Sequence, residues 1–252
     1  MPTHWLTLAM VRVKIDGFRS VEQALAAAEA GADFVGMVFA ESRRKISLED
    51  ASEIVRALGT PLRGLEMVSP PALFRTDATD LRAWFEHGAS ALERLLERKR
   101  PLTVGVFAGN DADEINEIVD ECGIDLVQLS GDEPWGACLL ANRQVIKVLH
   151  VQSKDDADAA MGRMQTGSAM AVLLDRADES AYGGTGKVLD WRVAAAVAAR
   201  MPVWLAGGLT PENVIEAVKA VRPWAVDVSS GVETDGVKDV AKIRAFVAAA
   251  KA

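Results

Sequence analysis

The sequence contains few cysteines and no long basic run. Only two cysteines, Cys122 and Cys138, occur among 252 residues, and this number excludes a disulfide framework or a pair of Cys-x-x-Cys metal sites. Acidic residues outnumber basic ones, 36 against 28, which gives a formal net charge of -8. No basic run is longer than Arg98-Lys99-Arg100. This charge pattern argues against a nucleic-acid partner, because a surface that binds phosphodiesters is built from clustered lysine and arginine.

Long hydrophobic runs and metal-ligand clusters are also missing from the sequence. No apolar run reaches the roughly 18 residues of a membrane span, and the first residues lack the charged and apolar regions of a secretory leader. The histidines His4, His87 and His150 are scattered, so we expect core or solvent-facing roles for them and no metal site. We expect a cytoplasmic protein without a membrane partner.

What the sequence does contain is a regular alternation of two kinds of segment. Short β-branched runs are each followed by a segment with helical spacing of apolar residues, which is typical of βα units. The predicted strands are 11–15, 34–39, 103–107, 125–129, 144–149, 169–174, 203–206 and 225–228; the predicted helices are 21–30, 48–58, 112–122, a segment after Pro134, 155–164, 191–199, 212–221 and 240–250.

About eight such units predict an α/β protein whose residues 1–252 form a single (β/α)₈ TIM barrel. The alternative is an open doubly wound sheet. That fold normally has fewer strands and a GxGxxG turn after the first strand, whereas this chain has Gly17-Phe18-Arg19 there.

Residues 59–101 form an insertion between the second helix and the third strand. A connection of about 2–6 residues is usual there, and this segment includes a predicted helix over 80–98. Because it follows a helix and precedes a strand, we expect it on the N-terminal face of the barrel, away from the chemistry. It is either an oligomer or partner surface or a tolerated excursion, and in both cases deletion of residues 69–97 is expected to leave the chemistry nearly intact.

Polar residues that follow the predicted strands are the candidates for a catalytic site, because barrel enzymes carry their chemistry at the C-terminal ends of strands. The candidates are Asp16, Glu41, Arg43, Arg44, Asn110, Gln128, Ser130, His150, Asp175 and Asp227. Asp16 and Asp175 are a carboxylate pair that is able to divide general acid and general base work. Either one alone is equally able to cap the following helix, and a glycosidase-like use of the pair is a further alternative.

Small residues follow the seventh and eighth predicted strands. Gly207 and Gly208, with Ser229, Ser230 and Gly231, would let backbone N–H groups approach a phosphate. The alternative is that the glycines only permit tight turns. The glycine-rich segment 182–187, which includes Gly183 and Gly184, is a mobile lid, a further phosphate-side loop or a plain linker.

Several motifs resemble those of the phosphoribosylanthranilate isomerase family of tryptophan biosynthesis. They are Val-Lys-Ile-Asp-Gly at 13–17, Ala-Asp-Phe-Val-Gly-Met-Val-Phe at 32–39, Val-Gly-Val-Phe at 104–107, Leu-Val-Gln-Leu-Ser-Gly at 126–131, Tyr-Gly-Gly-Thr-Gly-Lys at 182–187, Leu-Ala-Gly-Gly-Leu-Thr-Pro-Glu-Asn-Val at 205–214 and Val-Asp-Val-Ser-Ser-Gly-Val-Glu at 226–233. The resemblance covers nearly the whole chain outside the insertion.

The resemblance implies an Amadori rearrangement of N-(5-phosphoribosyl)anthranilate to 1-(2-carboxyphenylamino)-1-deoxyribulose 5-phosphate, without a cofactor. In the family, the position of Asp175 protonates the ring oxygen, the position of Asp16 removes the C2 proton, and an arginine matching Arg44, or else Arg43, faces the anthranilate carboxylate. We expect further substrate contacts from Lys14, Gln128, Gly183 and Gly184. The expected partner is a small phosphorylated sugar-anthranilate, and the expected assembly is a monomer or a homodimer.

Two positions depart from the family pattern. The family usually has cysteine where this chain has Asp16, and histidine where this chain has Ser130. A carboxylate is already ionised at neutral pH but is a weaker base than a thiolate. The departures keep two alternatives open: a related isomerase acting on the histidine-pathway aminoaldose or on both substrates, and an inactive homologue that binds phosphosugars.

Overall fold

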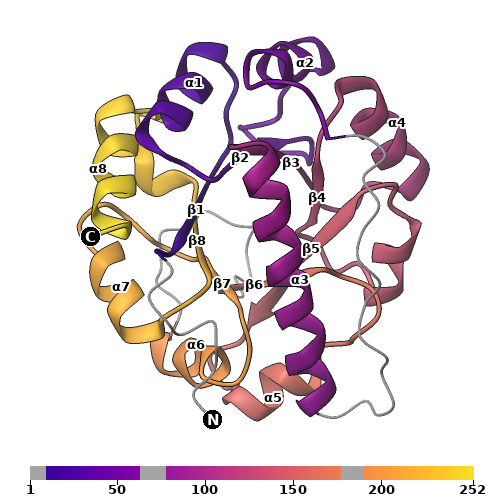
Figure 1. The fold of residues 1–252 in the computed structure, drawn as a ribbon, viewed down its shortest axis with the longest axis vertical. Helices are drawn as coiled ribbons and strands as arrows, with labels where there is room; N and C mark the ends of the chain where they lie inside the picture. The colour runs from indigo at the N-terminus through magenta and orange to yellow at the C-terminus, as the bar shows by residue number, and fades with distance from the viewer. Residues whose placement is uncertain (1–9, 63–77, 177–189) are drawn as a thin grey trace.

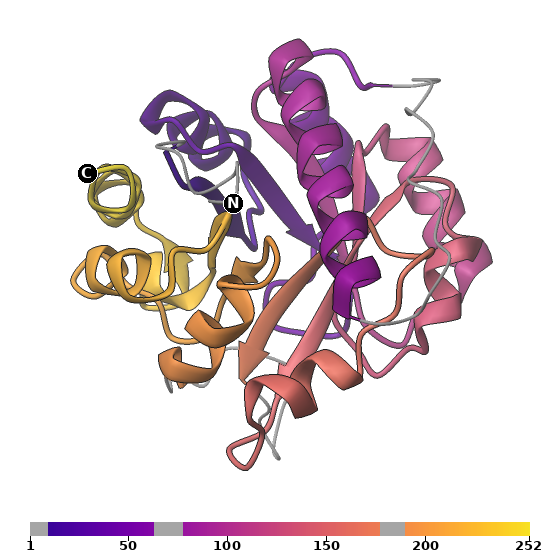
Figure 2. The same ribbon diagram turned by 60° about the horizontal axis from the view of Figure 1, so that its bottom comes forward.

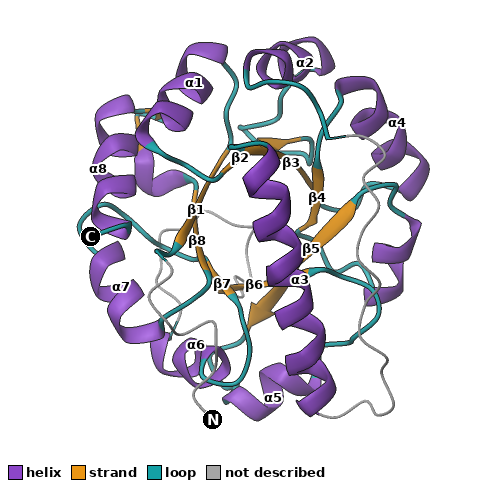
Figure 3. Ribbon diagram, viewed as in Figure 1, coloured by secondary structure: helices purple, strands orange, loops and turns teal. Residues whose placement is uncertain are grey.

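Eight parallel strands form a closed barrel in the computed structural model, which describes residues 10–62, 78–176 and 190–252. Figure 3 shows the strands as a ring enclosed by helices. The strands are β1 (Arg12–Asp16), β2 (Phe34–Val38), β3 (Leu102–Phe107), β4 (Leu126–Leu129), β5 (Gln144–Val151), β6 (Ala171–Arg176), β7 (Trp204–Leu205) and β8 (Ala225–Val228). Each strand pairs with its neighbour in sequence, and β1 pairs with β8. The predicted (β/α)₈ barrel is confirmed, and the open doubly wound alternative is wrong.

Helices follow most of the strands along the chain (Figure 1). They are α1 (Val21–Ala30), α2 (Leu48–Ala57), α3 (Ala78–Arg98), α4 (Ala112–Cys122), α5 (Ala157–Gly162), α6 (Trp191–Ala198), α7 (Val214–Val221) and α8 (Val240–Ala250), with short 3₁₀ helices η2 (Trp135–Leu140) and η3 (Ser230–Val232) and a hairpin of β9 (Glu233–Thr234) and β10 (Val237–Lys238). None of the described helices is long and apolar enough to cross a membrane.

Local sequence signals explain where the helices begin and end. The Ser20 hydroxyl accepts a hydrogen bond from the backbone N–H of Gln23 at the start of α1, and the Asp111 carboxylate accepts one from Glu114 at the start of α4. Such caps satisfy backbone donors that have no partner inside the helix. The chain then leaves α1 at Gly31 with a φ of 95°, a left-handed conformation that glycine adopts at little cost.

The segment after Pro134 differs from its expected form. It is the 3₁₀ helix η2, and its buried side chains Trp135 and Cys138 are three residues apart. That spacing places them on one face of a 3₁₀ helix, which has three residues per turn, so the segment covers the barrel without forming a regular α-helix. The helix expected over 155–164 is shorter, because the Asp156 side chain caps α5 at the N–H of Ala159.

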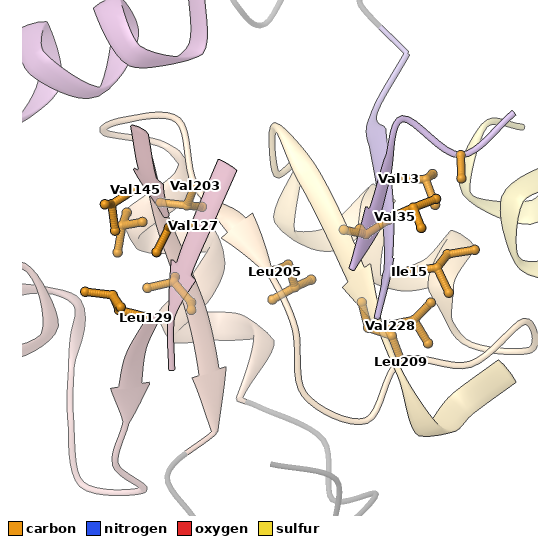
Figure 4. Close-up of a cluster of buried hydrophobic side chains, with 14 of the residues drawn as sticks. Val13, Ile15, Val35, Val127, Leu129, Val145, Val203, Leu205, Leu209 and Val228 are labelled. Atoms are coloured by element: carbon orange, nitrogen blue, oxygen red, sulfur yellow. The ribbon is translucent and has the colours of Figure 1, made fainter. Parts of the chain in front are cut away.

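An apolar layer fills the space between the strands and the surrounding helices. Figure 4 shows part of it, including Val13 and Ile15 of β1, Val127 and Leu129 of β4, and Leu205 of β7. Because successive side chains of a strand point to opposite faces, the residues between these, such as Lys14, Gln128 and Trp204, face the interior of the barrel. The strand alternation therefore places one set of side chains under the helices and the other around the barrel axis.

Helix α3 covers the N-terminal end of the barrel interior. It crosses the ring of strands in Figure 1 and remains against the strands in the turned view of Figure 2. Leu92, Leu95 and Leu96 of α3 belong to the same buried cluster as Phe34 and Leu102, the first residues of β2 and β3.

Polar contacts also fix α3 in place. The indole N–H of Trp84 donates to the carbonyl of Ala169 at 2.7 Å, just before β6, and the Arg12 guanidinium makes two hydrogen bonds to Glu93. A side chain at Gly88 would overlap the carbonyl of Met170. Loss of α3 would expose the apolar first residues of β2 and β3, and the expectation that deletion of residues 69–97 leaves the chemistry nearly intact stays a prediction.

Candidate active site

A cavity of about 270 Å³ lies at the carboxyl ends of the strands. Its lining combines polar side chains that end the strands with glycines and serines of the loops that follow. These residues include Asp16, Gln128, His150, Asp175 and Asp227 from the strands, and Arg44, Ser130, Gly207, Gly208, Ser229, Ser230 and Gly231 from the loops. Residues that are far apart in the sequence therefore meet at one end of the barrel.

Lys14 lies beneath the cavity and is fully buried. Its ammonium group forms ion pairs with the carboxylates of Asp16 and Asp227, the latter at 3.1 Å. Burial opposes the charged form of the lysine, but the two carboxylates outweigh that effect and raise the pKa of Lys14. Burial and the nearby charge of Asp16 raise the pKa of Asp227 to about 8. Lys14 therefore supports two carboxyl groups from below and is not part of the lining.

The carboxylate of Asp16 occupies space that Gly36 leaves open on the neighbouring strand. Asp16 and Gly36 pair in the register of β1 and β2, and a Cβ at position 36 would overlap Asp16 Oδ1. That oxygen is buried and accepts no hydrogen bond within the described parts of the chain. One carboxylate oxygen is thus held by Lys14, and the other is open to accept a proton.

Asp175 lies near the end of β6 and reaches the cavity from another part of the barrel. Its Oδ1 accepts a hydrogen bond from the backbone N–H of Arg176 at 2.7 Å. Burial raises the pKa of Asp175, and the charge of Asp16 acts in the same direction, while the N–H of Arg176 and His150 oppose the shift. A carboxyl group with a raised pKa keeps its proton to a higher pH, as a general acid requires.

His150, one of the strand-end candidates from the sequence, lines the cavity, although a core or solvent-facing role was the ordinary expectation for it. His150 pairs with Asp175 in the register of β5 and β6, and both line the cavity. The His150 Nε2 lies 2.9 Å from the carbonyl oxygen of Ser130. Because a carbonyl oxygen only accepts, Nε2 carries a hydrogen and donates it to Ser130. The signal for His150 was its place at the end of an apolar strand, which Asp175 shares.

Gln128 and Ser130 form a small polar group beside His150. The Gln128 amide donates to the Ser130 hydroxyl at 3.0 Å. Its carbonyl oxygen is buried and has no hydrogen-bond partner in the described residues. An unpaired buried acceptor costs free energy, and the Gln128 oxygen is available to accept a hydrogen bond at the cavity.

Two loops form the small-residue side of the cavity. Gly207 and Gly208 have φ values of 88° and 70°, which side chains other than glycine rarely adopt. Asn213 holds this loop by donating to the carbonyl of Gly208 at 2.9 Å. A Cβ at Gly231 would overlap the carbonyl of Leu209, so the two loops approach each other closely and leave the cavity wall without large side chains.

Arg43 and Arg44 differ in their position relative to the cavity. Arg44 lines it and has a side chain that is 13% exposed, whereas Arg43 is outside the lining and 58% exposed. Both guanidinium groups donate to Glu233. Hydrogen bonds from Arg44 and Lys238 lower the pKa of Glu233 to about 2, although burial opposes the charged form. The structure therefore brings Arg44 to the cavity and leaves Arg43 outside it.

The remaining site residues from the sequence analysis are Gly183 and Gly184, which lie outside the described residues. Within the described ranges, no group of three or more histidine, cysteine, aspartate or glutamate side chains is arranged to hold a metal ion. Cys122 and Cys138 are free and buried, and burial raises the pKa of both thiols, to about 11 for Cys138.

Comparison with known proteins agrees with this architecture. Residues 66–249 match the family model described as N-(5'phosphoribosyl)anthranilate (PRA) isomerase. The N-(5'-phosphoribosyl)anthranilate isomerase of Roseiflexus sp. (strain RS-1) is 43% identical over 244 residues, covering 96% of this chain and 99% of the relative.

Solved structures of the same family superpose on the barrel. Monomers generated from the dimeric enzyme of Thermotoga maritima match with a TM-score of 0.69 and 32% identity over 96% of this chain and 99% of that chain. A phosphoribosyl anthranilate isomerase in complex with reduced 1-(o-carboxyphenylamino)-1-deoxyribulose 5-phosphate matches with a TM-score of 0.67 and 31% identity, with the same coverage. The barrel, its cavity and this similarity over nearly the whole length lead to one conclusion: the chain belongs to the phosphoribosylanthranilate isomerase family.

Proposed function

We propose that this protein catalyses the Amadori rearrangement of N-(5-phosphoribosyl)anthranilate to 1-(2-carboxyphenylamino)-1-deoxyribulose 5-phosphate. The observation that carries the proposal is the presence of two carboxyl groups, Asp16 and Asp175, in one cavity whose wall also contains the loops Gly207-Gly208 and Ser229-Ser230-Gly231. General acid and base groups suit the proton transfers of the reaction, and small-residue loops at this end of a barrel suit the phosphate.

In the first step, Asp175 acts as the general acid. It donates a proton to the furanose ring oxygen, the bond between that oxygen and C1 breaks, and the nitrogen lone pair forms the C1=N bond of a protonated Schiff base. Because burial raises the pKa of Asp175, the carboxyl group holds its proton where an exposed aspartate has lost it. The nearby His150 faces the same cavity and favours return of the carboxylate form after the transfer.

In the second step, Asp16 acts as the general base. Its free Oδ1 accepts the proton from C2, and the C–H electrons form the C1=C2 bond while the C1=N electrons return to nitrogen. The enolamine then gains a proton at C1 and loses one from the C2 hydroxyl, which yields the aminoketose. Lys14 contacts the other oxygen of Asp16 and fixes the direction of the accepting oxygen.

Binding of the substrate uses its two charged ends. The phosphate is bound by the loops of Gly207, Gly208, Ser229, Ser230 and Gly231, where backbone N–H groups are able to approach it closely. Arg44 binds the anthranilate carboxylate, because a guanidinium offers paired donors that match a carboxylate. We assign this role to Arg44 in preference to Arg43 because only Arg44 lines the cavity.

The surroundings in which the reaction takes place are also part of the proposal. The small phosphorylated substrate needs no cofactor for a rearrangement that moves only protons. We propose action in the cytoplasm, supported by two buried thiols that remain free. A monomer or a homodimer is proposed for the assembly, since the Thermotoga maritima relative is a dimer from which monomers have been generated.

The decisive experiment follows the fluorescence decay of freshly prepared phosphoribosylanthranilate with the wild-type protein and with Asp175→Asn. Turnover by the wild type and a loss of about 10²–10⁴-fold in kcat for the variant are expected, the range that a general acid contributes. The variant should retain its affinity for reduced 1-(2-carboxyphenylamino)-1-deoxyribulose 5-phosphate. Absence of wild-type turnover with intact binding would favour the inactive phosphosugar binder, and turnover of the histidine-pathway aminoaldose alone would favour the related isomerase.

A further inference from the structure

Glu233 connects three segments that surround the cavity, although it does not line the cavity itself. It begins the β9–β10 hairpin directly after the serine-containing loop and η3. Its side chain is only 5% exposed. It accepts hydrogen bonds from Arg43 and Arg44 of the loop after β2 and from Lys238 of β10. Burial of the Glu233 carboxylate costs free energy, which its three cationic partners offset. Such an arrangement differs from an exposed ion pair and indicates a role for Glu233.

The bonds between Glu233 and Arg44 use one edge of the guanidinium. Arg44 Nε donates to Glu233 Oε1 at 2.6 Å, and Arg44 Nη2 donates to Oε2 at 3.1 Å. A guanidinium has five N–H donors in a plane. Glu233 occupies the Nε–Nη2 edge. The edge formed by Nη1 and the second hydrogen of Nη2 has no partner among the described residues, and it is a paired donor for another carboxylate.

The opposite side of Glu233 is anchored to the serine-containing loop. Lys238 is buried, and its ammonium donates to Glu233 Oε1 and to the carbonyl of Ser229, both at 2.8 Å. Gly17, which directly follows β1, packs against the methylene stem of Arg44, because its missing side chain leaves room for that stem. The Arg44 side chain is therefore held at its stem and along one guanidinium edge.

We propose that Glu233 is a positioning residue that sets substrate specificity: it occupies one edge of Arg44, aims the free edge into the cavity at an aryl carboxylate, and ties this orientation through Lys238 to the loop of Ser229. This inference rests on the proposed function, since it names the substrate group that Arg44 binds. The proposed role explains why the Glu233 carboxylate contacts Arg44, the residue that is to bind the carboxylate of the substrate.

The test measures binding, so it does not depend on turnover. Calorimetric titrations compare reduced 1-(2-carboxyphenylamino)-1-deoxyribulose 5-phosphate, which has both charged ends, with ribose 5-phosphate, which lacks the aryl carboxylate. For Glu233→Gln, we expect about a tenfold weaker Kd for the first ligand and less than a twofold change for the second, because the lost orientation affects only the carboxylate contact. Equal weakening of both ligands, or no weakening, would overturn the proposal.

A double-variant cycle separates positioning from a general structural effect. Arg44→Lys keeps the charge but removes the paired donors, so adding Glu233→Gln to it should weaken the first ligand by less than a further twofold. Full additivity of the two losses would contradict action through Arg44. Glu233→Asp keeps the buried charge with a shorter reach and should show a smaller loss with the same selectivity, which preserves the test if Glu233→Gln does not fold.

The matched control is Glu93→Gln, which breaks a two-bond pair with Arg12 at the other end of the barrel. It should leave both affinities unchanged. Turnover of phosphoribosylanthranilate by the wild type is recorded beside these titrations. A wild type that binds the first ligand with the predicted Glu233 dependence but shows no turnover would refute the proposed activity alone, whereas normal turnover without that dependence would refute the role of Glu233 alone.

Discussion

Gly36 on β2 provides the space that the carboxylate of Asp16 on β1 occupies. The two residues pair in the strand register, and any side chain at position 36 would overlap Asp16 Oδ1. The orientation of the proposed base therefore depends on the absence of a side chain one strand away. This relationship makes the placement of the base testable without changing the base itself.

We expect Gly36→Ala to lower kcat for phosphoribosylanthranilate by about 10²-fold, because a displacement of a reacting group by about 1 Å has an effect of that size. Steady-state kinetics and the affinity for the reduced product would be measured together, and the affinity should change little. Gly136→Ala is the control, since a Cβ there would meet nothing within 4 Å. An unchanged kcat for Gly36→Ala would argue against Asp16 Oδ1 as the proton acceptor.

The barrel was predictable from the sequence because each βα unit leaves a local signal. The ends of the predicted apolar runs placed Asp16, Gln128 and Asp175 at the carboxyl ends of strands, where the structure brings them together. The role of α3 was not predictable, because its amphipathic pattern does not say which surface covers its apolar face.

The choice between Arg43 and Arg44 and the position of His150 depended on contacts across the barrel. Arg43 and Arg44 are adjacent in the sequence, have the same chemistry and both donate to Glu233, and only their exposure and their position relative to the cavity separate them. His150 gave the same strand-end signal as Asp175, but a lone histidine is more often structural than functional. The hydrogen-bond partners that position Arg43 and His150 are 190 and 20 residues away in the sequence, beyond the reach of local patterns.

Ser230 tests the proposed phosphate site by charge. We expect Ser230→Glu to weaken binding of ribose 5-phosphate at least about tenfold more than Ser230→Gln, because the two new side chains have nearly the same size but only one repels an anion. Titration calorimetry at fixed ionic strength measures both affinities. Equal losses for the two variants would show that crowding, and not charge, weakens binding, and the phosphate would then have to lie elsewhere.

Asp227 predicts a pH dependence of stability with a definite sign. Its pKa is about 8 in the folded protein, against an ordinary value of about 3.9 for an aspartate. Between these values the folded state binds more protons than the unfolded state, so the contribution of Asp227 to the free energy of unfolding is complete below about pH 4 and is lost as the pH rises through about 8.

Urea unfolding at pH 5 and pH 8.5 would measure this effect in the wild type and in Asp227→Asn, whose neutral amide resembles the protonated carboxyl group. We expect the wild type to lose more stability than the variant between the two pH values. Asp113→Asn, at an exposed position on α4, should lose as much as the wild type. Parallel losses for the wild type and Asp227→Asn would contradict a raised pKa at Asp227.

Leu92 tests the finding that α3 is part of the barrel core. Its side chain has no exposed surface and belongs to the cluster with Phe34 and Trp204, so Leu92→Ala should lower the free energy of unfolding by about 2–5 kcal/mol. The kcat at 25 °C should be unchanged while the protein remains folded, because α3 lies at the end of the barrel opposite to the cavity. Leu139→Ala, which is 67% exposed on η2, should change stability by no more than about 0.5 kcal/mol. A Leu92→Ala variant as stable as Leu139→Ala would place α3 outside the core, and a lower kcat in the folded variant would show that the N-terminal end of the barrel influences the chemistry.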